Sequence, residues 1–398
     1  MNLSRNVKGD IYYVGASDRR LALFENIYPI ERGVSYNSYV IMDEKVVLLD
    51  TVDESVRGQF YENLYHTLSG RAIDYLVVNH VEPDHASMVE DVMRRFPSVK
   101  VVGNQMIIKF LTQFFGDELK ERALVVREGD SLETGHHKLT FVSAPMVHWP
   151  EVMFTYDAVD KVLFSADAFG TFGALSGSIF ADEYDFDREW LDDARRYYTN
   201  IVGKYGAQVC TVLEKAKSIE IEMILPLHGP IWRKDIGYFV SKYATWATYG
   251  VEEEGVLVVY ASIYGNTASV ASSIALKLGD RGIRNVHMYD VSKTDPSYIL
   301  SDCFKYGKVI FLSPTYNMGI FTKMENLLLD LKAHLWQKRD VALVECGTWS
   351  PQSGKLMKEI LSSMKDIRFP YDDVITIKSH GGDELEEKIN EMVEAIAK

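Results

Sequence analysis

The chain has 398 residues, 47% hydrophobic and 25% charged, which is typical of a globular protein with two or three domains. Its net charge of −14 disfavours nucleic acid and anionic membrane surfaces as partners. Three widely spaced cysteines without a C-x-x-C pair argue against disulfides and exclude a four-cysteine metal site on this chain; they are Cys210, Cys303 and Cys346. Residues 1–10 lack a signal-peptide core and no apolar run would span a membrane, so we expect a cytoplasmic location.

The first 250 residues have the pattern of a mixed α/β layer structure. Short apolar runs on either side of polar turns predict two β-hairpins, and further runs predict two strands and two helices. The hairpins are residues 39–42 with 46–49 and residues 153–156 with 162–164. The two strands are residues 75–78 and 139–143, and the two helices are residues 107–115 and 193–214.

The chain changes character at residues 251–254, between Gly250 and Gly255. Beyond this point, apolar runs alternate with amphipathic stretches, which predicts a doubly wound, five-stranded parallel sheet covered on both faces. The expected strands are residues 256–260, 285–291, 309–312, 341–344 and 374–377. The two clearest helices are residues 268–278 and 323–335. We therefore expect two domains, residues 1–250 and 251–398.

Side chains that bind metals follow the predicted strands of the first domain. The strand at 75–78 runs into Asn79-His80-Val81-Glu82-Pro83-Asp84-His85, which holds two imidazoles and two carboxylates within six residues. Three more candidates, His148, Asp167 and His228, each follow another apolar run. Alone, His148 or His228 is more typical of a packed core residue. Together, the seven side chains at rigid strand ends predict a metal site.

The H-x-E-x-D-H segment with its later His, Asp and His resembles the metallo-β-lactamase fold, an αββα sandwich, in its flavodiiron branch (A-type flavoproteins). Zinc hydrolases of that fold usually have histidine where this chain has Glu82, and a carboxylate shifts metal preference from zinc toward iron or manganese. The resemblance implies a catalytic non-haem diiron centre. One iron would be bound by His80, Glu82 and His148, and the other by Asp84, His85 and His228. Asp167 would bridge the two irons. Tyr197 or Tyr198 would either approach a bound oxygen species or pack in the core.

A candidate phosphate loop, Ser262-Ile263-Tyr264-Gly265-Asn266-Thr267, joins the predicted strand at 256–260 to a helix. Backbone N–H groups at a helix N-terminus bind phosphate, and small or hydroxylated residues let the backbone approach closely. The loop has neither a Walker ending nor the G-x-G-x-x-G dinucleotide fingerprint. It resembles the S/T-x-x-G-N-T loop of flavodoxin, which implies FMN.

Two later loops leave the carboxyl ends of parallel strands, where ligands bind in such sheets. Residues 313–319 match the flavodoxin loop beside the isoalloxazine ring well. Residues 346–351 match less closely, because the Gly–Trp spacing is altered and Pro351 is present. FMN binding is still expected, whereas the flavin's reduction potential and the role of Trp349 stay open. The candidates in these loops are Pro314, Thr315, Tyr316, Asn317, Gly319, Gly347, Thr348 and Trp349.

The resemblance covers essentially the whole chain in the expected domain order. It implies a flavodiiron oxidoreductase in which FMN passes electrons to two irons that reduce O2 to water, NO to N2O, or both. Because the chain has no C-x-x-C pair, we expect a separate electron donor, either a rubredoxin-like protein or a flavin reductase. The resemblance also implies a head-to-tail homodimer or dimer of dimers; the alternative is a monomer whose two domains fold over each other.

Three other functions are weighed against this one. A zinc hydrolase with a flavodoxin-like tail would bind zinc and no flavin, which Glu82 and the intact phosphate loop disfavour. A pure electron carrier would not need seven metal-type side chains. A nucleic-acid-processing member of the lactamase superfamily would need a basic face, whereas most of the net negative charge lies on residues 1–250.

Overall fold

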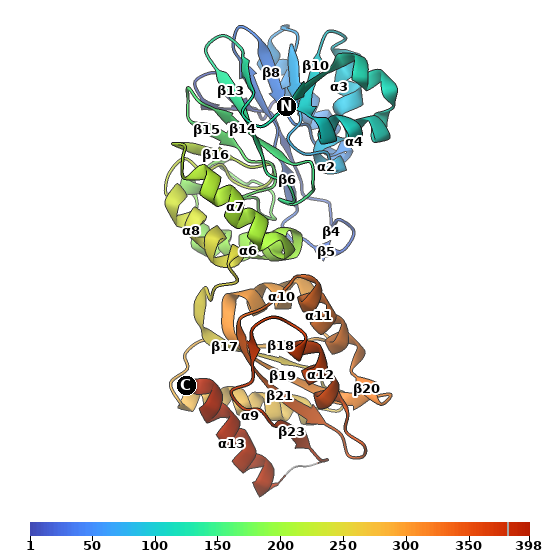
Figure 1. Ribbon diagram of the computed structural model, residues 1–398, viewed down its shortest axis with the longest axis vertical. Coiled ribbons are helices and arrows are strands. Elements are labelled where there is room, and N and C mark those ends of the chain that lie inside the picture. Colours follow the sequence, from blue (N-terminus) through green and yellow to red (C-terminus); the bar gives the residue numbers. More distant parts are fainter. Residues whose placement is uncertain (380–381) are drawn as a thin grey trace. The chain divides into compact units, whose positions relative to one another are not determined.

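The computed structural model describes residues 1–379 and 382–398 (Figure 1). The chain forms two compact units, Met1–Tyr198 with Ala207–Ala244, and Thr199–Gly206 with Thr245–Lys398. Among the described residues, no helix is both long enough and apolar enough to cross a membrane.

The first unit contains a seven-stranded sheet in the order β1-β2-β7-β8-β9-β10-β11. Strands β1 to β8 pair antiparallel, and β8 to β11 pair parallel. The hairpin predicted at 39–42 and 46–49 is confirmed as β7 and β8. The strands are Arg5–Lys8, Ile11–Tyr13, Tyr39–Met42, Val46–Leu49, Tyr75–Val77, Lys100–Asn104 and Ala123–Val126, in the order of the sheet.

The second sheet of this unit runs β12-β13-β14-β15-β16 and is antiparallel except for the last pair. It contains the second predicted hairpin, which is confirmed as β14 and β15. Its strands are Ser131–Glu133, Lys138–Ser143, Met153–Asp157, Val162–Phe164 and Met223–Leu225. Two small two-stranded sheets pair β3 (Ala16–Asp18) with β6 (Val34–Tyr36), and β4 (Leu23–Phe24) with β5 (Tyr28–Pro29).

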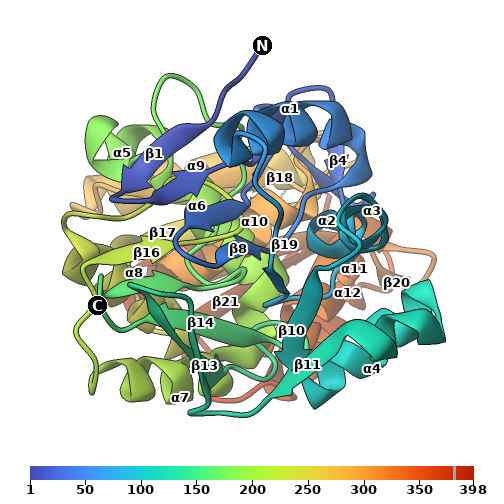
Figure 2. The same cartoon turned by 90° about the horizontal axis from the view of Figure 1, so that it is seen from above.

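The two sheets pack face to face, with Tyr39 of β7 and Phe164 of β15 in ring contact at 5.6 Å. Helices cover the outer faces: α4 packs on β10 and β11, and α7 lies beside β13 (Figure 2). This is the predicted αββα sandwich. Its helices are α1 Arg57–Leu68, α2 Pro83–Ala86, α3 Val89–Arg95, α4 Gln105–Phe115, α5 Phe186–Glu189, α6 Leu191–Tyr197, α7 Gly206–Ala216 and α8 Ile236–Ala247.

The prediction of one continuous helix over 193–214 was wrong. Between α6 and α7 the chain forms a π-helical turn, Tyr198–Val202, and a 3₁₀ turn, Gly203–Tyr205. The Gly203 carbonyl accepts a hydrogen bond from the Tyr249 hydroxyl at 3.0 Å, and a Cβ on Gly206 would lie 2.3 Å from the Ala247 carbonyl oxygen. Tertiary contacts of the backbone therefore override the helical pattern.

The second unit is built on a sheet whose five main strands are parallel, as predicted. Their spatial order is β18-β17-β19-β21-β23, which is 2-1-3-4-5 in chain order, the flavodoxin arrangement. Two short strands were not predicted, β20 (Gly319–Ile320) and β22 (Ile367–Arg368). The main strands are β17 Glu253–Tyr260, β18 Val286–Asp290, β19 Tyr306–Tyr316, β21 Arg339–Cys346 and β23 Val374–Ile377; β17 thus begins inside the expected linker.

Alternate residues of β17 face opposite sides of this sheet, because side chains alternate along a strand. Leu257 and Val259 pack with α10, α11 and α12, whereas Val256 and Val258 pack with α9 and α13. Every one of these four side chains is fully buried. The helices are α9 Asn266–Asp280, α10 Pro296–Lys305, α11 Thr322–Ala333, α12 Ser353–Ser362 and α13 Asp383–Ala397.

Candidate metal centre and flavin site

Strand ends bring the candidate metal ligands together. Strands β15 and β16 are parallel neighbours with Phe164 opposite Leu225. Asp167 and His228 each come three residues after these paired positions, so the register places them side by side. His80 follows the end of β9 in the same way, and Glu82 stands directly before Pro83, the first residue of α2.

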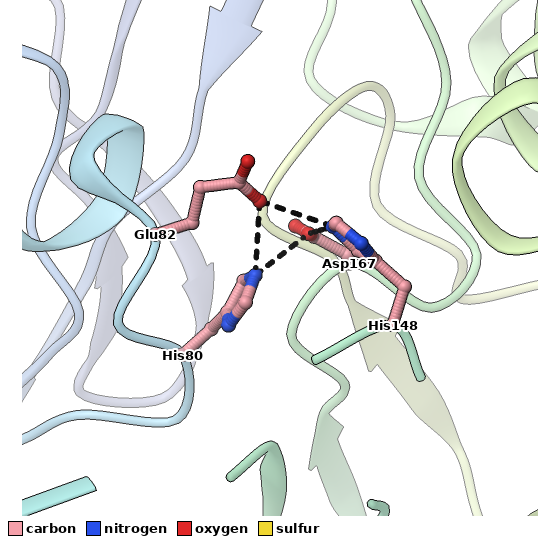
Figure 3. A group of neighbouring side chains, drawn as sticks. All are labelled: His80, Glu82, His148 and Asp167. Atoms are coloured by element: carbon pink, nitrogen blue, oxygen red, sulfur yellow. Dashed lines mark hydrogen bonds and ion pairs between the residues drawn. The ribbon is translucent and has the colours of Figure 1, made fainter. Parts of the chain in front are cut away.

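The first group of side chains consists of His80, Glu82, His148 and Asp167, which point toward one another (Figure 3). The Glu82 Oε2 atom lies 3.1 Å from His80 Nε2 and 3.0 Å from His148 Nε2. Asp167 Oδ2 lies 3.3 Å from His80 Nε2 and 3.1 Å from His148 Nε2. Two imidazole nitrogens and two carboxylate oxygens thus converge on one point.

A second group, Asp84, His85 and His228, lies on the other side of Asp167. The Nε2 atoms of His85 and His228 are 3.0 Å apart, and His228 Nε2 lies 3.2 Å from Asp84 Oδ2. Asp167 Oδ1, the second oxygen of that carboxylate, lies 3.1 Å from His85 Nε2. Asp167 therefore offers one oxygen to each group, and the structure brings all seven predicted side chains together.

The residues of both groups fit metal ions. Neither oxygen of Asp84, nor Asp167 Oδ1, has a hydrogen-bond partner among the described residues, although all three atoms are buried. Burying carboxylate oxygens without hydrogen bonds is costly, and bound cations remove that cost. Burial alone raises the pKa of Asp167, but the nearby His80 and His85 hold it well below its usual range, so the group is an anion.

Hydrogen bonds from the outer imidazole nitrogens fix the tautomers of two histidines. His80 Nδ1 donates to Glu151 Oε1 at 2.8 Å, and His228 Nδ1 donates to the Ser35 carbonyl at 2.7 Å. Each acceptor forces the proton onto Nδ1, which leaves the Nε2 lone pair free to bind a metal. His85 Nδ1 has no such partner among the described residues.

Sequence reasoning missed the residues that support this centre. Glu151 is fully buried and also accepts a bond from the Val81 amide at 3.1 Å. Asp50 accepts bonds from the Asn79 amide and side chain, both at 2.7 Å, and so holds the loop that carries His80. Neither acid belongs to a recognisable spacing pattern, so only their burial in the fold reveals them.

Aromatic side chains and one more acid close the centre. Phe24, on the β4–β5 hairpin, and Tyr197 contact His228 at ring distances of 5.4 and 5.5 Å. Glu25 lies at the exposed tip of the same hairpin, where partial desolvation and the nearby Glu82 charge raise its pKa to about 8. The Tyr197 hydroxyl is buried and lacks a partner among the described residues, whereas the Tyr198 ring packs on Tyr243.

In the second unit, a pocket of about 280 Å³ opens at the carboxyl ends of β17, β19 and β21. The first strand of a 2-1-3-4-5 sheet and its third-strand neighbour form the switch point where such folds bind flavin. The pocket is lined by Ser262, Ile263, Tyr264, Asn266, Thr267, Pro314, Thr315, Asn317, Met318, Cys346, Gly347, Thr348 and Trp349. Met318 and Cys346 were not predicted, and three predicted residues do not line it: Gly265, Tyr316 and Gly319.

The first loop of the pocket has the backbone geometry of an anion site. Gly265 has φ +98°, a left-handed conformation, immediately before the first residue of the fifteen-residue helix α9. Ser262 Oγ accepts bonds from the Gly265 and Ala268 amides at 3.1 and 3.3 Å. The exposed N–H groups of this helix start suit a phosphate.

The other two loops hold each other in place. Thr315 Oγ1 accepts bonds from the Gln352 and Ser353 amides at 2.9 and 3.1 Å, so this hydroxyl caps α12. The side chains of Tyr264 and Trp349 are 94% and 74% exposed on the pocket rim. Two exposed aromatic rings beside a pocket suit a planar ligand such as isoalloxazine.

Comparisons with known proteins assign a family to each part of the chain. Residues 34–229 match the ODP family beta lactamase and residues 258–390 match flavodoxin. The chain is 32% identical over 350 residues to the anaerobic nitric oxide reductase flavorubredoxin of Vibrio vulnificus, covering 87% of this chain and 70% of that relative. This chain belongs to the flavodiiron family.

Solved structures of flavodiiron proteins share the fold along the whole chain. The flavodiiron protein from Giardia intestinalis superposes with a TM-score of 0.92 at 27% identity, covering 100% of this chain and 96% of that one. Rubredoxin oxygen:oxidoreductase from Desulfovibrio gigas gives 0.92 at 28% identity, covering 99% and 98%. The predicted fold class is confirmed, and this flavodiiron protein is an oxidoreductase with FMN and a non-haem diiron centre as cofactors.

Proposed function

We propose that this flavodiiron protein reduces O2 to water, NO to N2O, or both, with electrons supplied through FMN. The observation that carries the proposal is the pair of buried ligand groups that share the two oxygens of Asp167. A nitric oxide reductase and a rubredoxin oxygen:oxidoreductase among its relatives support it. Residues 1–250 would hold the irons, and residues 251–398 the flavin.

The ligand roles belong to the same proposal. When bound, the irons supply Lewis acidity and exchange electrons with the gas. His80, Glu82 and His148 would bind one iron, Asp84, His85 and His228 the other, and Asp167 both. Three carboxylates among these ligands favour iron over zinc.

Residues around the ligands would orient the gas and hold protons. The Tyr197 hydroxyl would hydrogen-bond a bound gas molecule, because it is buried without a partner among the described residues and its ring contacts His228. Glu151 would keep the Nδ1 proton of His80 pointing away from the iron.

FMN would bind with its phosphate at the start of α9, on Ser262 to Thr267, and its ring between the two later loops. Because the chain has no C-x-x-C pair, a rubredoxin-like protein or a flavin reductase would supply electrons. We further propose a head-to-tail homodimer, or a dimer of such dimers, in which each FMN serves the partner's irons. The three free cysteines support a cytoplasmic location.

Metal and flavin analysis followed by gas turnover tests this function. After expression in iron-replete medium, we expect about two irons and one FMN per chain, the stoichiometry of one diiron site and one flavodoxin pocket. The anaerobically reduced protein is then mixed with O2 and, separately, with NO under the same donor. Two zincs and a colourless protein, or an iron-loaded protein that reacts with neither gas, would contradict the proposal.

A further inference from the structure

An apolar pocket of about 480 Å³ lies on the outer face of the second sheet of the first unit. Strands β13, β14 and β15 form its floor, and α7, α8 and residues 217–221 form its walls. Among its lining side chains are Phe141, Phe154, Leu163, Val212, Ile219 and Val240. A pocket of this volume and lining is of the kind that binds small apolar molecules.

The charged groups at the rim of this pocket are all paired. Lys215 Nζ lies 2.6 Å from Glu128 Oε1 and 3.1 Å from the Ser143 carbonyl oxygen. Lys217 Nζ lies 2.5 Å from Glu214 Oε1. The rim therefore offers no unpaired charge to an ionic ligand, and the lining favours a neutral, apolar occupant.

One tight turn connects this pocket to the metal centre. In residues 165–170, the Ala168 amide bonds the Ser165 carbonyl and the Gly170 amide bonds the Asp167 carbonyl, both at 3.0 Å. The Asp167 carboxylate faces the metal-site histidines, whereas the ring of Phe169, two residues later, lines the pocket. Residues 167 and 169 of one turn therefore face the metal centre and the pocket, respectively.

The solvent-facing side of the metal centre is polar and suits protons and electrons better than a neutral gas. Among the seven candidate ligands, the side chains of Glu82, Asp84 and His148 are 14%, 13% and 10% exposed, so the side of the centre that reaches solvent is polar. Protons and electrons reach a metal site most readily through such a polar face. A neutral gas is not drawn to charges, but it concentrates in apolar space.

We infer that the apolar pocket collects O2 or NO and delivers it to the metal centre past Phe169. This inference rests on the proposed function, since it names the route by which the gas substrate enters. It concerns delivery alone, so the pocket residues are not catalytic, and narrowing the pocket lowers the rate at low gas concentration while leaving the rate at saturation unchanged.

Tryptophan substitutions narrow the pocket from two walls. Val212→Trp on α7 and Val240→Trp on α8 are made singly and together, with Thr211→Trp and Ser241→Trp on the exposed sides of the same helices as matched controls. Crystals under xenon report whether the pocket holds an apolar atom. Stopped-flow mixing of the fully reduced protein with O2 or NO gives the second-order rate constant and the saturating rate.

We expect a xenon peak in the wild-type pocket that the double substitution removes. The second-order rate constant should then fall about fivefold or more, with iron content, FMN content and saturating rate unchanged. The controls should match the wild type. If the double variant does not fold, each single variant should show a smaller decrease in the same constant.

Two results would overturn the inference. One is an unchanged second-order rate constant in a loaded variant that has lost its xenon peak. The other is a larger apolar molecule that co-purifies in the pocket and whose removal leaves gas kinetics unaltered. A loaded wild type that holds xenon but reacts with neither gas would instead refute the proposed function, and with it any delivery role.

Discussion

Glu82 is the residue on which the proposed preference for iron over zinc depends. Its carboxylate contacts two imidazoles at 3.1 and 3.0 Å, where zinc hydrolases of this fold carry histidine. We expect Glu82→His to raise the zinc content at the expense of iron, because imidazole is a softer ligand than carboxylate, and to abolish O2 and NO reduction. Metal analysis and turnover measure both effects, and unchanged FMN content is the internal control. A fully active, iron-loaded variant would contradict the assignment.

Glu151 is expected to act through His80 and not on the metal itself. Removing such an outer partner typically weakens metal binding about 10- to 100-fold. Glu151→Gln keeps the shape and the acceptor for His80 Nδ1 but loses the charge, so its effect should be smaller than that of Glu151→Ala. Iron affinity measured against a chelator tests this order. Glu133→Gln, an exposed acid on β12, is the control, and equal affinity in all variants would refute the role.

His137, a buried histidine outside the metal centre, makes the stability of the fold depend on pH. His137 donates from Nδ1 to Asp157 at 2.6 Å and from Nε2 to Asp10 at 2.7 Å. Burial alone lowers the pKa of His137, but the two carboxylates outweigh it and raise it to about 9. A group whose pKa is higher in the folded state contributes its full stabilisation of the fold at pH values below its unfolded pKa, about 6.5 for histidine. The folded protein loses that contribution as pH rises through about 9.

We therefore expect the stability lost in His137→Gln to be largest near pH 6 and to shrink toward pH 9.5. Denaturant unfolding of the loaded proteins across that range measures the difference. His136→Gln serves as the control, since the neighbouring His136 is 61% exposed and lies 3.9 Å from its closest carboxylate. A loss that does not vary with pH would show that His137 is neutral in the folded protein.

The helix start at Gly265 is the element on which the proposed binding of the FMN phosphate depends. Gly265→Asp adds a negative charge where the phosphate would bind, whereas Gly265→Asn has nearly the same shape without the charge. Asp and Asn are similarly strained in the left-handed backbone conformation at φ +98°. A difference between the two variants therefore reports the effect of charge and not of backbone strain. We expect FMN affinity at least about tenfold lower for Asp than for Asn, with iron content unchanged in both. Equal affinities, measured by FMN fluorescence quenching, would place the phosphate elsewhere.

At the scale of the whole molecule, the head-to-tail dimer predicts complementation between two inactive chains. One chain carries Gly265→Asp and is stripped of the FMN that it binds more weakly; the other carries His80→Ala with Asp167→Ala and lacks iron. A two-fold dimer that pairs each FMN with the partner's irons leaves one intact pair in the mixed dimer. We expect each homodimer to be inactive and gas reduction to return after subunit exchange.

The mixed dimer must be demonstrated before its activity is interpreted. Differently tagged chains purified over two affinity steps establish its composition, and FMN and iron analysis establishes its loading. A mixed dimer that carries both cofactors and stays inactive would refute transfer between subunits. A monomer in solution would do so directly.

The sequence by itself determined which residue types stand at the strand ends and in what order the two folds follow each other. His80 to His85 and Ser262 to Thr267 are contiguous, and apolar runs mark the strands before them, so local pattern is sufficient to find them. The same reasoning gave one helix over 193–214, because periodicity does not register the contacts of Gly203 and Gly206 with distant backbone.

Only the tertiary structure decided how these residues meet. The parallel pairing of β15 with β16 sets Asp167 beside His228, and the packing of the two sheets then lets one carboxylate face both ligand groups. Glu151 and Asp50 became visible in the same way, as buried acceptors whose donors come from other segments. Strand register and burial depend on residues far apart in the chain, and therefore no local pattern could specify them.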